Sequence, residues 1–143
     1  MSAFVKQYEN CKMCPRKCGV DRINVTESRR SGLCGMDSQL IVSYMGPHFG
    51  EEPPISGTNG SGTIFFSGCT LKCSFCQNYQ ISREGIGEPL TLEELFEKTS
   101  EMIDEHNVHN INLVTPDHFI PHIQGLVMLL RDKGYSLPMV YNL

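Results

Sequence analysis

The sequence has no tryptophan, no apolar stretch long enough to cross a bilayer and no excess of basic residues. A spanning helix needs about 20 consecutive apolar residues, so we expect no membrane segment. The formal net charge of −4 lacks the basic field of a nucleic-acid binder, so we expect no nucleic-acid partner. Residues 1–10 lack the apolar core of a signal peptide, which favours a cytoplasmic location.

Cysteine, in contrast to tryptophan, is abundant. The chain of 143 residues holds seven cysteines, an odd number, and most of them are closely spaced. Without an export signal, this pattern favours reduced thiolates gathered around metal over a disulfide framework. They are Cys11, Cys14, Cys18, Cys34, Cys69, Cys73 and Cys76.

The composition changes along the chain and suggests three segments. Residues 1–45 are rich in cysteine and are expected to form a small metal-binding segment. Residues 46–62 are rich in Gly, Pro and Ser and are expected to form a connecting loop. Residues 63–143 alternate between β-favouring runs and amphipathic helical patterns, as expected for an α/β unit.

Within the last segment the pattern predicts strand, helix, strand, helix and strand. The expected strands are 63–66, 110–114 and 137–143, and the expected helices are 91–106 and 119–133. Thr91 and Glu94 form a capping-box pattern at the start of the first helix. Such a βαβαβ order implies parallel strands with right-handed crossovers. We therefore expect the first part of a larger barrel of the TIM type, because three parallel strands alone bury little surface.

Three of the cysteines follow the first expected strand with the spacing C-x3-C-x2-C. Cys69, Cys73 and Cys76 can converge on one iron-sulfur cluster, because thiolate sulfur is a soft ligand. A [4Fe–4S] cluster needs four ligands, so its fourth iron would be open to an exchangeable ligand. The alternatives are a zinc site, which usually has four ligands, and a ferredoxin-type cluster, which uses different spacing.

The spacing, the aromatic Phe75 before the last cysteine and the preceding strand resemble the radical S-adenosylmethionine (SAM) superfamily. The resemblance implies that Cys69, Cys73 and Cys76 ligate a [4Fe–4S] cluster and that SAM binds its open iron. It further implies reductive cleavage of SAM to a 5'-deoxyadenosyl radical that abstracts hydrogen from a substrate. Phe75 and Gln77 would then bind SAM.

A narrower resemblance is to pyruvate formate-lyase activating enzyme-like proteins. It rests on GSGTIFFSGC, CSFCQNYQIS, HFGEEPPISG, NLVTPDHFIPHI and LPMVYNL. The implied partners are a glycyl radical enzyme or a small-molecule substrate, and an electron donor such as flavodoxin or ferredoxin. In place of the Gly-Gly-Glu type SAM motif the chain has residues 114–118, where Thr115 is the candidate cofactor contact. The competing hypotheses are a non-catalytic iron-sulfur or zinc module and an inactive fragment of a longer enzyme.

The N-terminal cysteines offer a second set of thiolates. Cys11, Cys14 and Cys18, with Cys34 further on, are enough for one closed four-ligand site. Zinc and an auxiliary iron-sulfur cluster both fit this ligand set.

Other polar residues give weaker signals. His118 and His122 have helical i, i+4 spacing but no HExxH pattern, so we expect them at a helix start on the surface, or His118 at a pocket rim. Asp117 is the expected cap of the second helix.

Overall fold

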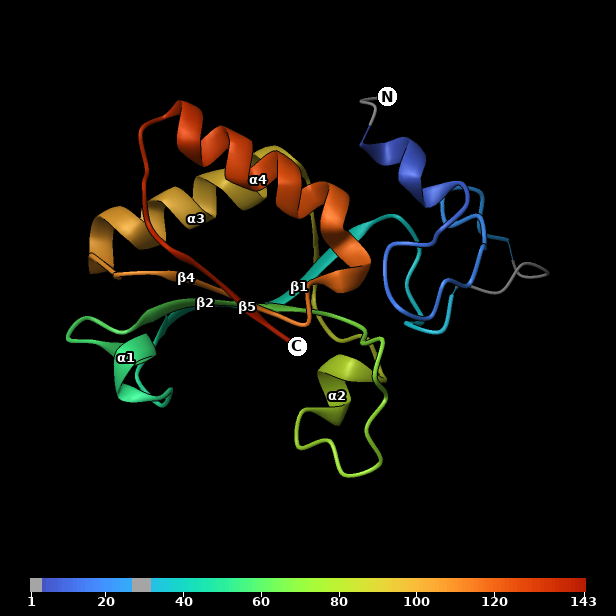
Figure 1. The fold of residues 1–143 in the computed structure, drawn as a ribbon, viewed down its shortest axis with the longest axis horizontal. Helices are drawn as coiled ribbons and strands as arrows, with labels where there is room; N and C mark the ends of the chain where they lie inside the picture. The colour runs from blue at the N-terminus through green and yellow to red at the C-terminus, as the bar shows by residue number, and fades with distance from the viewer. Residues whose placement is uncertain (1–3, 27–31) are drawn as a thin grey trace.

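The computed structural model describes residues 4–26 and 32–143, which form a five-stranded sheet with two long helices on one face (Figure 1). The long helices are α3 (Leu92–His106) and α4 (Ile120–Asp132). The strands in sheet order are β3 (Glu88–Leu90), β1 (Leu40–His48), β2 (Ser61–Phe66), β4 (Ile111–Val114) and β5 (Met139–Asn142). The short helices are η1 (Val5–Tyr8), α1 (Pro53–Ser56), α2 (Tyr79–Ser82) and η2 (Asp117–Phe119).

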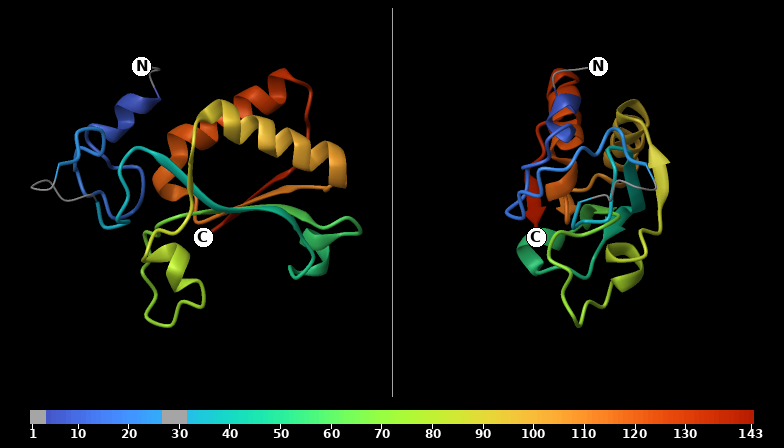
Figure 2. Two further views of the ribbon diagram at one scale, coloured as in Figure 1. Left: turned by 180° about the vertical axis from the view of Figure 1, so that it is seen from behind. Right: turned by 90° about the vertical axis from the view of Figure 1, so that its right-hand side faces the viewer.

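The predicted βαβαβ unit is confirmed in its order and strand direction. β2 pairs in parallel with β4, and β4 pairs in parallel with β5. Helices α3 and α4 are the crossovers between these strands (Figure 2). The carboxyl ends of the three strands therefore meet at one edge, where ligands bind in parallel α/β sheets.

The sheet is not parallel throughout, because two strands that the sequence did not predict run antiparallel to their neighbours. β1 pairs antiparallel with both β2 and β3, so the sheet is mixed and open. β1 begins within the expected metal-binding segment and ends within the expected connecting loop, which also contains α1. The strand was not predicted because Gly46 and Pro47 favour loops. β3 pairs only with Leu40–Val42, so none of the described strands pairs with the outer side of β1 at Pro47. A proline, which has no N–H to donate, is tolerated at such an unpaired edge.

The capping box at the start of α3 is confirmed. The Thr91 hydroxyl accepts a hydrogen bond from the Glu94 N–H, and the Glu94 carboxylate accepts one from the Thr91 N–H. Gly125 lets α4 pack closely on α3, since a Cβ there would lie 2.6 Å from Leu92 Cδ2. The two helices therefore cover one face of the sheet as a single layer.

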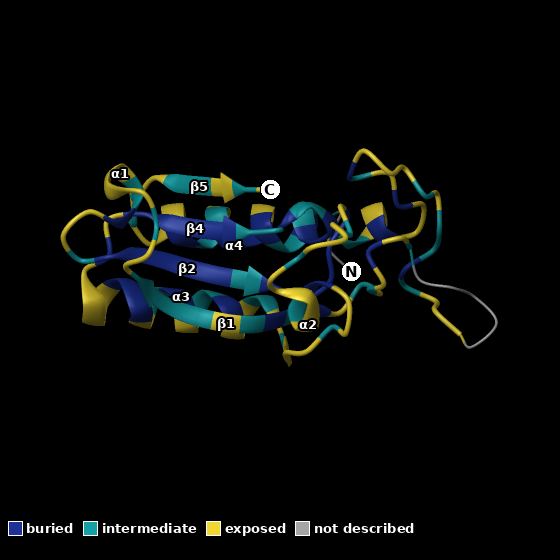
Figure 3. Cartoon of the chain, turned by 90° about the horizontal axis from the view of Figure 1, so that it is seen from below, coloured by how far each residue is buried: buried dark blue, intermediate teal, exposed yellow. Residues whose placement is uncertain are grey.

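The core lies between that helix layer and the central strands (Figure 3). Ile64 and Phe66 of β2, with Ile111 and Leu113 of β4, are almost completely buried there. The N-terminal segment lies at the end of the sheet from which α2 and its preceding loop project (Figures 1 and 2). Among the described residues, no helix is both long and apolar enough to cross a membrane.

Candidate metal centre

The three clustered cysteines lie on the loop between β2 and α2, which we call the triad loop (residues 67–78). It starts at the carboxyl end of β2, as the sequence predicted. Cys69 is buried at its base, Cys76 is half-buried and Cys73 is exposed. All three are free thiols, so the loop presents sulfur from the interior out to the surface.

Two of these sulfurs already accept hydrogen bonds. The Leu71 N–H donates to Cys69 Sγ at 3.3 Å, and the Ser82 hydroxyl donates to Cys76 Sγ at 3.4 Å. Donors of this kind orient the sulfur ligands of a metal site. The loop therefore already positions two of its three sulfurs.

Two arginines hold the backbone of the triad loop from outside. Arg16 donates through Nε to the Thr70 carbonyl at 2.9 Å and through Nη2 to the Leu71 carbonyl at 3.3 Å. Arg83 donates through Nη2 to the carbonyls of Lys72 at 3.0 Å and Cys73 at 2.7 Å. Four consecutive carbonyls thus point toward guanidinium groups.

This arrangement fixes where the N–H groups point. In a trans peptide the carbonyl and the following N–H point in opposite directions. Because the carbonyls of residues 70–73 face the arginines, the N–H groups of residues 71–74 face away from them. The Leu71 N–H does meet Cys69 Sγ. Lys72 has a φ of 56°, an unusual value for a non-glycine residue that is expected where function constrains the backbone.

A cavity of about 110 Å³ opens beside Cys69 at the carboxyl edge of the parallel strands. Thr115 also borders it and has a φ of 52°. Its hydroxyl donates to the Phe66 carbonyl at 3.3 Å. The complete lining is Pro15, Arg16, Cys69, Thr70, Leu71, Thr115, Asp117 and Leu143. Typical small-molecule pockets measure about 300–1,000 Å³, so these residues enclose only part of a nucleoside-sized ligand.

Phe75 and Gln77 are not part of this cavity. Both are exposed, and the Phe75 side chain is 90% accessible. The structure therefore brings Thr115 and Cys69 to one cavity but leaves the two residues beside Cys76 on the outer part of the triad loop. Their expected contact with a cofactor stays a prediction.

Asp117 does not cap α4, contrary to the sequence expectation. It begins the short helix η2, and Phe119 is the residue at the start of α4. Its carboxylate accepts hydrogen bonds from the Tyr141 hydroxyl at 3.0 Å and from the Thr70 hydroxyl at 3.4 Å. Burial and the bond to Asp117 raise the pKa of Tyr141. Asp117 thus links β5 to the triad loop across the cavity.

His118 is buried and does not lie at a surface helix start or a pocket rim. Its Nε2 donates to the Ser67 carbonyl at 2.6 Å, which ties η2 to the beginning of the triad loop. Burial lowers the pKa of His118 to about 4, so the ring is neutral near pH 7. Sequence spacing could not reveal this, since the partner lies 51 positions away.

The four N-terminal cysteines lie in the segment that contacts the triad loop through Arg16. Cys11, Cys14 and Cys34 are buried, and Cys18 is half-buried. Burial raises the pKa of the Cys34 thiol, while Arg22 opposes this effect and Cys11 and Cys14 add to it. Cys11, Cys14 and Cys34 therefore lie in one neighbourhood, and the sulfurs of Cys18 and Cys34 both lie beside Gly32.

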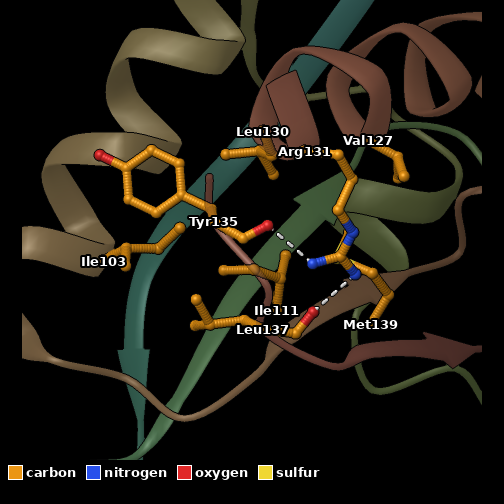
Figure 4. A pocket seen from close by; sticks show the side chains of 8 residues that line it. All are labelled: Ile103, Ile111, Val127, Leu130, Arg131, Tyr135, Leu137 and Met139. Carbon is orange, nitrogen blue, oxygen red and sulfur yellow. Dashed lines mark hydrogen bonds between the residues drawn. The ribbon is translucent and has the colours of Figure 1, made fainter. Parts of the chain in front are cut away.

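Another hollow lies under the helices, away from the cysteines (Figure 4). It measures about 10 Å³, which is room for no more than one water. Arg131 closes the turn beside it by donating to the carbonyls of Tyr135 and Leu137. We regard this hollow as a packing gap and not as a binding site.

Comparison with known proteins decides the family. The family model of the Radical SAM superfamily matches residues 63–142, which include the triad loop and most of the cavity lining. The chain belongs to the radical SAM superfamily. The superfamily generally uses a [4Fe–4S] cluster and SAM, so both are implied for this radical SAM chain.

A relative extends the similarity into the N-terminal segment. An uncharacterized protein of Methanocaldococcus jannaschii is 30% identical over 141 residues, which cover 94% of this chain. The same alignment covers 38% of that protein, so the chain spans well under half the length of this relative. No solved structure gives a significant match.

The donor set of the triad loop fits the cluster that the radical SAM family implies. It offers three soft sulfur ligands on one loop, with hydrogen-bond donors already aimed at two of them. Within residues 4–26 and 32–143, no three Cys, His, Asp or Glu side chains already surround one point. Side-chain rotation is therefore needed when a metal centre is bound.

Proposed function

We propose that Cys69, Cys73 and Cys76 hold a [4Fe–4S] cluster and that SAM occupies the adjoining cavity. The observation that carries the proposal is the opening of Cys69 onto a cavity at the carboxyl edge of β2, β4 and β5. A cluster with SAM bound supplies one-electron cleavage of the SAM sulfonium, which yields methionine and a 5'-deoxyadenosyl radical.

The protein's own residues position these groups. Arg16 and Arg83 hold the triad loop so that its N–H groups face away from them, and the Leu71 N–H meets Cys69 Sγ. Thr115 borders the cavity from the end of β4 and is proposed to contact SAM. Phe75 and Gln77, on either side of Cys76, are proposed to contact SAM from the outer part of the triad loop.

The proposed reaction is hydrogen abstraction from a partner. By resemblance to activating enzymes, that partner is a glycyl radical protein, with a small molecule as the alternative. The electron comes from a donor such as flavodoxin or ferredoxin. We further propose that the metal-binding segment lies within residues 1–45 and that most of the SAM-binding part lies within residues 63–143. Residues 46–62 connect them through the end of β1 and through α1, and Pro15 and Arg16 of the N-terminal segment also border the SAM cavity.

The small cavity and the exposed Cys73 favour one alternative, a non-catalytic iron-sulfur or zinc module. The two functions differ in what SAM does. The test is anaerobic incubation of reconstituted protein with SAM and dithionite, followed by chromatography for 5'-deoxyadenosine. Product that is absent from the Cys69→Ala/Cys73→Ala/Cys76→Ala variant supports the radical SAM function. A loaded cluster that yields no product above that control supports the alternative.

A further inference from the structure

The N-terminal cysteines have no part in the proposed SAM chemistry, but the backbone around them is ordered by hydrogen bonds. Two of these bonds join the ends of the turn formed by residues 11–20, which contains the first three cysteines. The Cys11 N–H donates to the Val20 carbonyl at 3.0 Å, and the Gly19 N–H donates to the Cys11 carbonyl at 2.8 Å. Inside this turn, the Lys17 N–H donates to the Cys14 carbonyl at 3.0 Å. The turn therefore holds Cys11, Cys14 and Cys18 in one compact loop.

Cys34 joins this loop from further along the chain. A Cβ placed on Gly32 would lie 3.6 Å from Cys18 Sγ and 3.8 Å from Cys34 Sγ. Both sulfurs therefore approach the same point above Gly32. An alanine at this position would make ordinary van der Waals contact with both.

Donors and positive charge surround these sulfurs. The Leu33 N–H donates to Cys18 Sγ at 3.5 Å, and Arg22 donates through Nη1 to Cys11 Sγ at 3.6 Å. Arg22 is completely buried, so its guanidinium charge needs a nearby negative partner. Thiolates at a metal site supply such charge, whereas four neutral thiols do not.

We propose that Cys11, Cys14, Cys18 and Cys34 bind one tetrahedral ion of the zinc type, and that this ion fixes the segment that holds the triad loop. Zn–S bonds of about 2.3 Å place the four sulfurs about 3.8 Å apart. Rotation about χ1 moves a cysteine sulfur by up to about 3 Å, so the sulfurs of Cys18 and Cys34 beside Gly32 can turn toward a shared ion. Binding releases the thiol protons to solvent.

The second half of the proposal rests on the proposed function and on three places where the N-terminal segment lies close to the triad loop or to Gly68 at its start. Arg16, between Cys14 and Cys18, donates to the triad-loop carbonyls. A Cβ on Gly68 would lie 3.0 Å from the Cys34 carbonyl oxygen. A Cβ on Gly35 would lie 3.6 Å from Lys72 Nζ. Because these residues flank the proposed zinc ligands, losing the ion should disturb the triad loop.

Metal analysis of the full chain tests the site independently of SAM chemistry. We expect one zinc per chain in the wild type and in the Cys69→Ala/Cys73→Ala/Cys76→Ala variant. Cys18→Ser should lower zinc to less than a tenth, whereas Cys18→His should keep it, since Cys₃His is an established zinc ligand set. If Cys18→Ser fails to fold, mercurial release of zinc from the folded triple variant gives the stoichiometry directly.

The outcomes separate the two proposals. Iron and sulfide retained by the triple variant in place of zinc would overturn a single-ion site, and so would no metal at all. Zinc at one per chain without any cluster in the wild type would leave the zinc site standing and refute the proposed function. The electron paramagnetic resonance (EPR) spectrum of the triad-loop cluster should change in Cys18→Ser and be restored in Cys18→His. An unchanged spectrum after zinc loss would refute the coupling between the two units.

Discussion

Arg22 donates through Nη1 to the His118 carbonyl at 2.6 Å, although 96 positions separate the two residues. His118 in turn donates to the Ser67 carbonyl at the beginning of the triad loop. The same guanidinium donates to the carbonyls of Met36 and Asp37. One buried side chain thus ties the N-terminal segment to the end of the sheet that carries the proposed cluster.

Replacing Arg22 should destabilise the fold strongly. Arg22→Met should lower the free energy of unfolding by about 2–4 kcal/mol, because three backbone carbonyls lose a charged donor. Urea denaturation measures the change. The exposed Lys12→Ala serves as the control and should stay within about 0.5 kcal/mol of the wild type. A small effect of Arg22→Met would mean that solvent replaces these bonds.

Arg83 should matter for the cluster more than for stability. Its side chain is exposed, so Arg83→Gln should change the free energy of unfolding by less than about 1 kcal/mol. Its loss frees the carbonyls of Lys72 and Cys73, so we expect lower cluster occupancy and a shifted EPR spectrum. Arg131→Gln is a matched control, because Arg131 also holds two carbonyls but lies away from the cysteines. Equal effects of the two variants on the spectrum would contradict a positioning role for Arg83.

Thr115 should show opposite effects on stability and binding. Its left-handed backbone costs about 1–3 kcal/mol for a β-branched residue, so Thr115→Gly should stabilise the protein by about 1 kcal/mol. The same change removes the hydroxyl and side chain from the cavity, so SAM binding by the reconstituted protein should weaken several-fold. Calorimetry measures both quantities. An unchanged SAM affinity would show that Thr115 does not contact SAM.

The fold should weaken in mild acid. Burial lowers the pKa of His122 to about 4 from an ordinary value of 6.5, and the Tyr8 hydroxyl lies 2.7 Å from its Nδ1. The unfolded chain binds this proton more readily, so stability should fall as pH drops from 6.5 toward 4. His122→Gln should reduce this loss by on the order of 1–2 kcal/mol. As a control, replacing the exposed His106 with Gln should leave the pH dependence of stability to urea unchanged. A similar effect of both variants would show that His122 is not the source of the loss of stability in acid.

Local patterns in the sequence predicted a large part of this structure. The Thr91–Glu94 capping box, the parallel strands and the position of the triad loop all depend on residues close together in the chain. β1 was missed because Gly and Pro within it favour loops, and a neighbouring strand overrides that preference.

The burial of Arg22 and His118 could not be predicted in this way. Each has a favourable environment only because segments about 50 to 100 positions apart meet at one end of the sheet. Arg16 and Arg83 were missed as candidate site residues for the same reason. Their role depends on carbonyl directions in a folded loop, which no spacing of residue types reveals.

EPR of the anaerobically reconstituted and reduced protein, with and without SAM, distinguishes a cluster with an open iron from a closed one. We expect a [4Fe–4S] signal that changes on adding SAM and disappears in the Cys69→Ala/Cys73→Ala/Cys76→Ala variant. A cluster signal that does not respond to SAM would contradict an open iron beside the cavity. Retention of the signal in the triple variant would place the cluster elsewhere in the protein.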